Sequence, residues 1–316
     1  MSDNTKIEWC DATWNPIVGC TPVSEGCAHC YAARMASRFP KTFGGVAHGT
    51  NWTGKVHFRK SEEETPLHWR KPRRVFVCSM GDLFHERVPY DWIDRVYSTM
   101  ALCRQHTFLL LTKRPERALA YAMMLKTGDP PQDAPRGYVG QYGLLASYES
   151  HELGYLDNVW YGVSAENQEQ ADQRIPLMLQ TPAAKRFVSI EPMLGPIDFL
   201  DVDSVVSQSM HPGLGYPADG IEWVIVGGET GPGARPMHPN WVRRLRDQCS
   251  QAEIPFFFKG WGDWVHEQCL SRDKVDRRTV EDRFFVIDQD HSFFRVGKKR
   301  AGRLLDGRTH DDFPST

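Results

Sequence analysis

The sequence predicts an α/β protein that folds as a full or partial (β/α) barrel of about six parallel strands. Short runs of apolar and β-branched residues recur along the chain, and most of them end in a polar or glycine-rich turn. Segments with apolar residues at helical spacing fall between several of these runs. Nearly continuous apolar strands that alternate with helices are typical of a parallel sheet covered on both faces. Six or seven such units fit a barrel better than a small open sheet.

The individual elements follow from these patterns in chain order. The expected strands are residues 75–78, 108–111, 159–163, 186–190, 223–226 and 255–258. The expected helices are residues 90–105, 168–179 and 240–252, the last with Asn240 as its candidate N-cap. Two stretches near 126–157 and 201–220 interrupt the alternation and are expected to be loop insertions. The barrel is therefore expected to occupy residues 1–265, and residues 266–316 are expected to form a C-terminal extension that packs on it.

The composition narrows the class of protein. The chain has 316 residues, of which 41% are hydrophobic and 25% charged, as in ordinary globular proteins. It shows no long apolar run and no signal-peptide pattern, which predicts a cytoplasmic protein without membrane contact. The net charge is −2, so any contact with a nucleic acid must come from local basic patches. The candidate patches are residues 70–74, 113–114, 243–246 and 298–300.

Three cysteines in one short loop are the most informative motif. Cys20, Cys27 and Cys30 form a C-x6-C-x2-C pattern among turn-forming residues. In a reducing compartment such a trio favours a metal over disulfides. A four-iron cluster held by three cysteines leaves one iron free for another molecule. A structural zinc site is the alternative, with His29, Cys10 or a distant residue as fourth ligand, although the chain offers no second C-x2-C or H-x3-H pair.

Polar side chains follow the predicted strands directly. In a barrel these positions gather at one end, where active sites are built. They are Asp82, His85, Lys113, Arg114, Ser164, Glu166, Asn167, Glu191, Glu229, Lys259 and Asp263. Glycines such as Gly227 and Gly228 allow close backbone approach to a ligand. Because the strands are apolar and their ends polar, the pattern indicates an enzyme more than a scaffold.

The cysteine loop resembles a known superfamily. Three cysteines at the front of a (β/α) barrel, with the aromatic Tyr31 beside the last one, resemble the radical S-adenosylmethionine (SAM) enzymes. Their commonest spacing is C-x3-C-x2-C, and here the first interval is three residues longer. Residues 7–16, 189–196 and 226–237, together with the cysteine loop, also resemble a "three-Cys-motif" family of phage and bacterial proteins of unknown function. This wider resemblance covers nearly the whole chain.

The resemblance implies a mechanism and its cofactors. Cys20, Cys27 and Cys30 would hold a [4Fe–4S] cluster whose free iron binds SAM. Reductive cleavage of SAM would give a 5′-deoxyadenosyl radical that takes a hydrogen atom from the substrate. Asp82 is the candidate partner of the SAM ammonium, and Lys113 or Arg114 of its carboxylate. The other candidates for contacts with SAM or substrate are Tyr31, Ser164, Glu166, Asn167, Glu191, Gly228 and Glu229.

Several of these residues also have a purely structural interpretation. Asp82 and Glu166 are equally candidates for helix caps, because Asp and Glu are common at helix starts. The neighbouring Lys113 and Arg114 are candidates for a solvated pair. Glu191 is a candidate for a carboxylate buried against a cation.

The resemblance also suggests a substrate and a partner. Phages often hypermodify their DNA, so the leading substrate is a nucleobase in DNA, such as a thymine whose substituent is rearranged or carbon-linked by an isomerase, mutase or transferase reaction. A duplex substrate would need that base flipped out. Flavodoxin or ferredoxin is the expected type of electron donor. The alternatives are a radical SAM enzyme for a small metabolite or peptide, and a zinc-stabilised, non-catalytic binding module.

Overall fold

The computed structural model describes residues 5–136, 138, 155–199, 220–267, 284–288 and 291–315. The predicted insertions at 126–157 and 201–220 therefore lie largely outside the described residues, and so does part of the predicted C-terminal extension. No helix within the described residues is long and apolar enough to cross a membrane.

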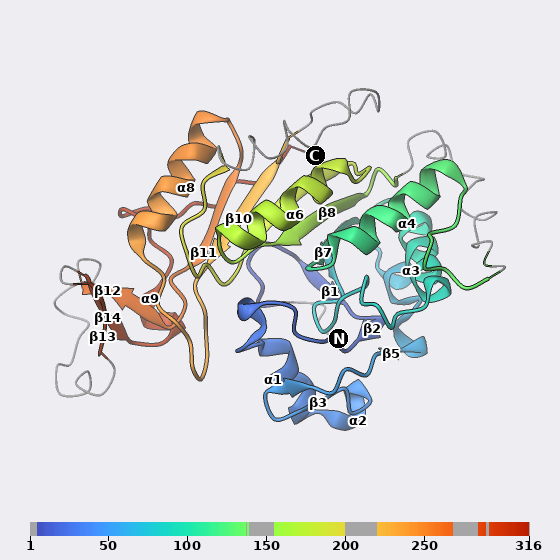
Figure 1. The fold of residues 1–316 in the computed structure, drawn as a ribbon, viewed down its shortest axis with the longest axis horizontal. Coiled ribbons are helices and arrows are strands. Elements are labelled where there is room, and N and C mark those ends of the chain that lie inside the picture. The colour runs from blue at the N-terminus through green and yellow to red at the C-terminus, as the bar shows by residue number, and fades with distance from the viewer. Residues whose placement is uncertain are drawn as a thin grey trace.

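A seven-stranded parallel sheet forms the centre of the fold (Figure 1). Its strands lie side by side in chain order: β1 (Ala12–Trp14), β6 (Arg74–Val77), β7 (Thr107–Thr112), β8 (Val159–Ser164), β9 (Lys185–Ile190), β10 (Trp223–Gly227) and β11 (Phe256–Gly260). Every neighbouring pair is parallel. In the described residues β1 and β11 are the two edges, so the sheet is a partial barrel. The predicted fold class is confirmed, with one strand more than expected.

The additional strand is β1, and its short length explains why the sequence does not reveal it. Only three residues pair with β6, and Pro16 follows within two positions. A run of this length carries no alternation that can be read as a strand.

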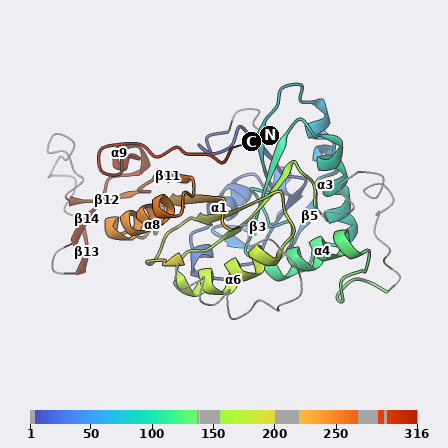
Figure 2. The same cartoon turned by 90° about the horizontal axis from the view of Figure 1, so that it is seen from above.

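Four helices cover the outer face of the sheet: α3 (Tyr90–Leu102), α4 (Pro115–Thr127), α6 (Gln168–Gln180) and α8 (Pro239–Gln251). Figure 2 shows them as an arc on one side, with both chain termini on the other. Three agree with predicted helices, and α4 is additional. The predicted N-cap of α8 is wrong. His238 occupies that position, its Nδ1 accepts a hydrogen bond from the amide of Asn240 at 3.0 Å, and Pro239 begins the helix.

The inner face of the sheet changes character along the strands. Near the amino ends it is aromatic, with Trp160 on β8, Phe187 on β9 and Trp223 on β10 in one buried cluster. Near the carboxyl ends the same face carries Ser164 and Glu191, because alternate residues of a strand share a face. The aromatic half closes the barrel at one end. Polar chemistry is therefore confined to the carboxyl ends of the strands.

The end of the chain packs on this aromatic cluster. Phe313 lies 5.1 Å from Trp223 between ring centroids, and Asp311 forms a β-bridge with Phe257. The preceding elements are β12 (Trp264–His266), β13 (Phe284–Asp288), β14 (His291–Arg295) and α9 (Lys298–Ala301). Strand β12 spans the predicted domain boundary at residue 265 and pairs with β14. The division into two domains remains a prediction.

A small substructure follows the cysteine loop outside the sheet. It contains α1 (Tyr31–Arg38), α2 (Pro40–Phe43) and a hairpin of β3 (Ala47–His48) and β4 (Asn51–Trp52). A buried cluster of mainly small side chains holds these elements together: Val18, Ala32, Ala33, Ala36, Val46, Ala47 and Met80. The pairing of β2 (Ile17–Val18) with β5 (His57–Phe58) joins the substructure to the barrel. The remaining short helices are η1 (Glu25–Cys27), η2 (Lys60–Glu62) and η3 (Thr65–His68).

Candidate functional site

The cysteine loop, residues 19–30, lies against the carboxyl ends of the parallel strands. At its start Gly19 forms a parallel β-bridge with Gly81, which follows β6. In its middle the amide of Gly26 donates a hydrogen bond to Glu166 Oε1 at 3.2 Å, and Glu166 follows β8. Strands that are not adjacent in the sheet therefore hold the two parts of the loop. This placement brings the cysteines to the end of the barrel where the polar strand ends gather.

Arg114 connects the strand ends to the first cysteine. Its side chain is only 9% exposed and reaches both the loop and two carboxylates. It donates to Asp82 Oδ2 at 3.0 Å and to Glu86 Oε2 at 2.9 Å. It also donates to the carbonyl and hydroxyl oxygens of Thr21 at 3.1 and 2.8 Å, and its Nη1 lies 3.6 Å from Cys20 Sγ. The planar guanidinium thereby fixes the beginning of the loop.

Asp82 has no free acceptor position in this arrangement. Its Oδ1 accepts from Thr112 Oγ1 at 2.7 Å and from the amide of Phe84 at 3.0 Å. Its Oδ2 accepts from the amide of Lys113 at 3.2 Å as well as from Arg114. Asp82 is therefore not a helix cap. It holds the turn after β6 against the end of β7 and orients Arg114 toward the loop.

Glu166 is the second buried carboxylate of the site. Its fully buried side chain lies 3.1 Å from Lys113 Nζ and 3.1 Å from Arg174 Nη1, in addition to the amide of Gly26. Burial raises the pKa of Glu166, but the Lys113 ammonium and further partners outweigh it and hold the pKa below its usual value. Lys113 also lowers the pKa of the Cys27 thiol, again against the effect of burial. Thus one cation favours both the carboxylate and a loop thiolate.

The three cysteines differ in their surroundings. Burial, followed by the charge of Asp82, raises the pKa of Cys20 to about 12. Cys27 has a lowered pKa, with Ser24 Oγ 3.8 Å from its sulfur. Cys30 stands at the start of α1 and is half-buried.

The cysteines match an iron–sulfur cluster in donor type, but the structure does not group them around one metal position. Three sulfur donors come from one loop, and Lys113 and Arg114 stand beside them to balance negative charge. Their side chains do not converge as they stand, because the described part of the chain holds no group of three or more His, Cys, Asp or Glu arranged around a metal position.

The two nearby residues proposed for a zinc site are engaged elsewhere. Cys10 is buried in the aromatic cluster, its sulfur lies 3.9 Å from the carbonyl oxygen of Ile7, and burial raises its pKa to about 12. His29 lies in the loop, and its Nδ1 is 3.1 Å from Glu229 Oε2. Neither side chain is grouped with the three loop cysteines.

Glu229, after β10, holds the far side of the loop. Arg235 donates to its two oxygens from Nε at 2.9 Å and from Nη2 at 2.8 Å. Burial raises the pKa of Glu229, but the hydrogen bonds from Arg235 and His29 lower it by more, so the pKa lies below its usual value. Arg235 Nη2 also donates to the carbonyl oxygen of Glu25 at 3.1 Å. A third strand end is thereby joined to the loop.

The residues after β8 have mixed roles. Asn167, rather than Glu166, is the N-cap of α6, and its side chain accepts from the amide of Gln170 at 3.0 Å. The amide nitrogen of the same side chain donates to Glu25 Oε1 at 2.7 Å. Ser164 is buried, and its carbonyl oxygen accepts from Arg174 at 2.6 Å.

The remaining predicted site residues lie elsewhere around the strand ends. Glu191 Oε1 is 2.8 Å from Lys259 Nζ, so the predicted pairing of Glu191 with a cation is present. A Cβ on Gly228 would lie 2.1 Å from the carbonyl oxygen of Trp261, which shows that this glycine accommodates the protein's own backbone. The Tyr31 hydroxyl donates to the carbonyl oxygen of Ser79 at 2.9 Å.

Sequence patterns do not reveal four members of this network. They are Thr21, Glu86, Arg174 and Arg235. Arg235 lies within the 226–237 motif, which is a usable signal. Arg174 sits inside α6, and nothing in the local sequence distinguishes it from an ordinary helix-surface arginine.

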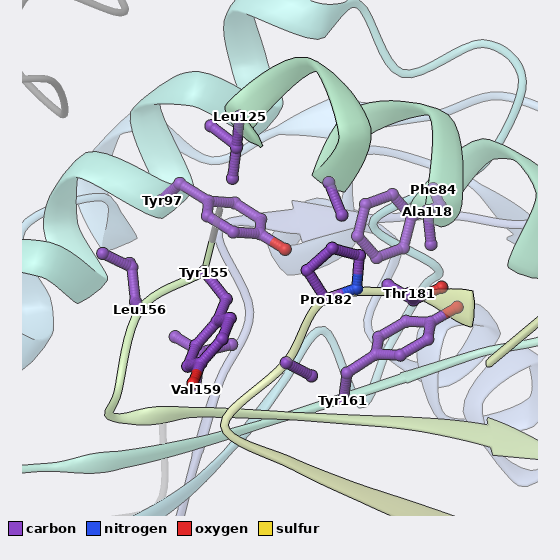
Figure 3. A pocket seen from close by; sticks show the side chains of 12 residues that line it. Phe84, Tyr97, Ala118, Leu125, Tyr155, Leu156, Val159, Tyr161, Thr181 and Pro182 are labelled. Carbon is purple, nitrogen blue, oxygen red and sulfur yellow. The ribbon is translucent and has the colours of Figure 1, made fainter. Parts of the chain in front are cut away.

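The small enclosed cavity shown in Figure 3 is not part of this site. It lies beneath α3 and α4, and its lining includes Phe84, Tyr97 and Tyr161. Its volume of about 10 Å³ accommodates about one water molecule, so no cofactor fits there.

Fold and site define a class: a partial (β/α) barrel whose strand ends hold a three-cysteine loop. Residues 4–314 match the model of a family described as "Protein of unknown function (DUF5131)", and the chain belongs to this family. No curated protein matches. A solved structure of "Spore photoproduct lyase complexed with dinucleoside spore photoproduct" aligns over 90% of this chain and 68% of that chain, with 8% identity and a TM-score of 0.34. A likeness this weak decides nothing about chemistry.

Proposed function

We propose that this protein is a radical SAM enzyme in which Cys20, Cys27 and Cys30 hold a [4Fe–4S] cluster, and that it acts on a nucleobase in DNA. The observation that carries the proposal is the position of the cysteine loop against the carboxyl ends of a parallel sheet, tied there by Arg114, Glu166 and others. A structural metal loop needs no such connection to the strand ends. A reactive centre needs one, because substrate groups must be fixed relative to it.

Cys20, Cys27 and Cys30 would hold the cluster, which would supply the electron for cleavage of the SAM sulfonium. The chain's own residues prepare the site. Arg114 positions the Cys20 end of the loop, and Lys113 favours deprotonation of Cys27. The aromatic inner face below the strand ends excludes water from that side of the site.

Each charged SAM candidate already pairs with an oppositely charged side chain, and the candidates differ in how exposed they are. Asp82 pairs with Arg114, and Arg114 donates hydrogen bonds to the loop, so we assign both residues to holding the loop. Lys113 and Glu191 have side chains 17% and 18% exposed at the same end of the barrel. We assign Lys113 to the SAM carboxylate and Glu191 to its ammonium, because each then meets the opposite charge.

The substrate and the electron donor complete the proposal. A nucleobase that reaches a barrel end must leave the base stack, so single-stranded DNA or a flipped base is the form that fits. The electron required for SAM cleavage comes from a small redox protein of the flavodoxin or ferredoxin type.

The test is anaerobic reconstitution followed by SAM cleavage. The expected result is about four iron and four sulfide per chain, and release of 5′-deoxyadenosine when SAM and dithionite are added. Cys27→Ser should abolish both, whereas Cys249→Ala, which removes a thiol buried in α8, should preserve both.

Two outcomes would contradict the proposal. A colourless protein with one zinc and no sulfide would support the zinc-stabilised binding module instead. A bound cluster without SAM cleavage would leave a structural or electron-transfer role.

A further inference from the structure

One segment of the chain concentrates positive charge next to the cysteine loop. Residues 26–60 contain six lysine or arginine residues and no aspartate or glutamate, in a protein whose net charge is −2. This segment, called the 26–60 segment below, includes the end of the loop, α1, α2 and the β3–β4 hairpin. Figure 1 shows α1, α2 and β3 as a group beside the barrel rather than within its helical layer.

Most of these cations have no partner in the described part of the chain. Arg38, Lys41, Lys55 and Lys60 are exposed and form no ion pair with any described residue. The other two have partners: Arg59 Nη2 lies 2.8 Å from Glu62 Oε1, and Arg34 Nη2 donates to the carbonyl oxygen of Thr230 at 3.1 Å.

The basic patches recognised from the sequence are different, because acidic side chains neutralise a cation in each. Arg74 lies 3.5 Å from Asp11, and Lys298 Nζ lies 2.8 Å from Glu8 Oε1. Arg243 and Arg246 share Asp306 at 2.8 and 2.6 Å. The Lys113–Arg114 patch is paired with the carboxylates of the site. Arg70, Lys71, Lys299 and Arg300 in these patches are also exposed without an ion pair to a described residue, but each of their patches also contains a neutralised cation. The 26–60 segment differs because it carries four such cations and no acidic residue.

Exposed apolar side chains concentrate at the same place. Of the seven large hydrophobic side chains exposed in the described chain, Val23 belongs to the cysteine loop, and Tyr31, Met35 and Phe39 to α1 and its C-cap. The last three are spaced four residues apart and so lie along one face of the helix. Aromatic side chains among cations are the usual combination for binding unstacked bases and their phosphates.

The free cations flank the cysteine loop on both sides. Helix α1, with Arg38 at its end, begins directly after Cys30. On the other side the backbone of Lys55 lies against Gly19, so closely that a Cβ on Gly19 would be 2.1 Å from the Lys55 carbonyl oxygen. A base presented at the loop has phosphates on both its 5′ and its 3′ side. Cations at both ends of the loop match that arrangement.

We infer that the 26–60 segment binds a single polynucleotide strand, with Arg38, Lys41 and Lys55 on the phosphates and Phe39 and Met35 against unstacked bases. This inference takes the substrate class from the proposed function and adds the surface that holds it. A small acidic redox protein is the rival occupant. It is the weaker fit, because such a partner needs one compact patch near the loop rather than cations at both of its ends.

The test measures binding of a fluorescein-labelled 16-nucleotide single-stranded DNA by anisotropy, with the anaerobically purified full chain at several salt concentrations. Arg38→Gln/Lys41→Gln is compared with Arg70→Gln/Lys71→Gln, which removes the same residue types at exposed positions before β6. We expect the first pair to weaken binding about tenfold at 0.1 M salt and to lower the salt slope by roughly 1.4, and the control pair to change neither. Lys55→Gln and Phe39→Ser should each weaken binding on their own.

The outcomes separate this inference from the proposed function. If a chain without a cluster binds the DNA strand and this binding depends on Arg38 and Lys41, the binding surface is supported and the radical mechanism is overturned. A competent cluster with no strand binding, or with equal losses in the two double variants, overturns the surface and leaves the mechanism standing. If reduced flavodoxin binds through the same two cations and the DNA strand does not bind, the inference is overturned and the surface belongs to a small redox protein. Single-stranded RNA and duplex DNA of the same sequence show which form of strand is preferred.

Discussion

Two regions beside the cysteine loop are rich in charge, and they use it in opposite ways. At the strand ends, Arg114 and Glu166 are buried, and each contacts several oppositely charged or polar partners. In the 26–60 segment, Arg38 and Lys55 are exposed and form no ion pair with described residues. A charge fixed by burial and several partners positions the chain itself. A charge left free at the surface is available to something outside it.

The largest expected effect comes from removing the central cation of the strand-end network. Arg114→Met leaves Asp82 buried without its countercharge, and we expect the free energy of unfolding to fall by about 3–5 kcal/mol. Urea denaturation measures this value. Arg38→Met is the matched control and should change the free energy of unfolding by less than about 0.5 kcal/mol. Equal losses in the two variants would show that the two regions do not differ as described.

A smaller loss is expected at the far side of the loop. Glu229→Gln weakens the paired hydrogen bonds from Arg235, whose side chain is about a third exposed, so solvent already screens part of the interaction. We expect a decrease of about 1–2 kcal/mol in the free energy of unfolding. The control is Glu25→Gln at a largely exposed carboxylate, which should be close to neutral. A Glu229→Gln variant as stable as wild type would remove Glu229 from the set of residues that hold the loop.

The same carboxylates predict how stability depends on pH. The pKa values of Glu166 and Glu229 are lowered from 4.5 in the folded protein, so the folded state binds fewer protons than the unfolded state in that range. Their stabilisation is complete above about pH 4.5 and is lost as the pH falls through the lower folded values. Thermal unfolding between pH 7 and pH 3 should show a shallower acid loss for Glu229→Gln than for wild type. Identical acid profiles would contradict this assignment.

The smallest effect on stability is expected in the 26–60 segment. Arg38 and Lys41 are exposed and form no ion pair with a described residue, so Arg38→Gln/Lys41→Gln should keep the melting temperature within about 2 °C of wild type. The same variant should lose strand affinity, which separates a binding surface from a structural one. A large drop in melting temperature would mean that these cations stabilise the fold.

The strands of the barrel are predicted well from the sequence, because a local run of apolar residues marks most of them. Residues 108–111, 159–163 and 186–190 are apolar runs with clear ends, and each is found within a strand of the sheet. Strand β1 is not predicted, because a run of three residues shows no alternation that identifies a strand. The N-cap at Asn240 is wrong because His238 supplies an acceptor that propensity alone does not favour at that position.

The site is predicted less completely, because pairing depends on tertiary structure. The strand-end carboxylates can be chosen from their positions, but nothing local shows that Arg174 reaches Glu166 from within α6. The basic patch at 243–246 looks free in the sequence, and Asp306, some sixty residues later, neutralises much of it. The 26–60 segment looks unremarkable because its cations are dispersed, and folding brings them to both ends of the loop.

The central claim is that the strand ends hold a three-cysteine loop whose cluster has an open position for SAM. Electron paramagnetic resonance of the reduced, reconstituted protein, recorded with and without SAM, tests it most directly. The account predicts a cluster signal whose shape changes when SAM is added, and the loss of that signal in Cys20→Ser. A cluster signal that SAM leaves unchanged, or a protein that retains zinc and gives no signal, would contradict it.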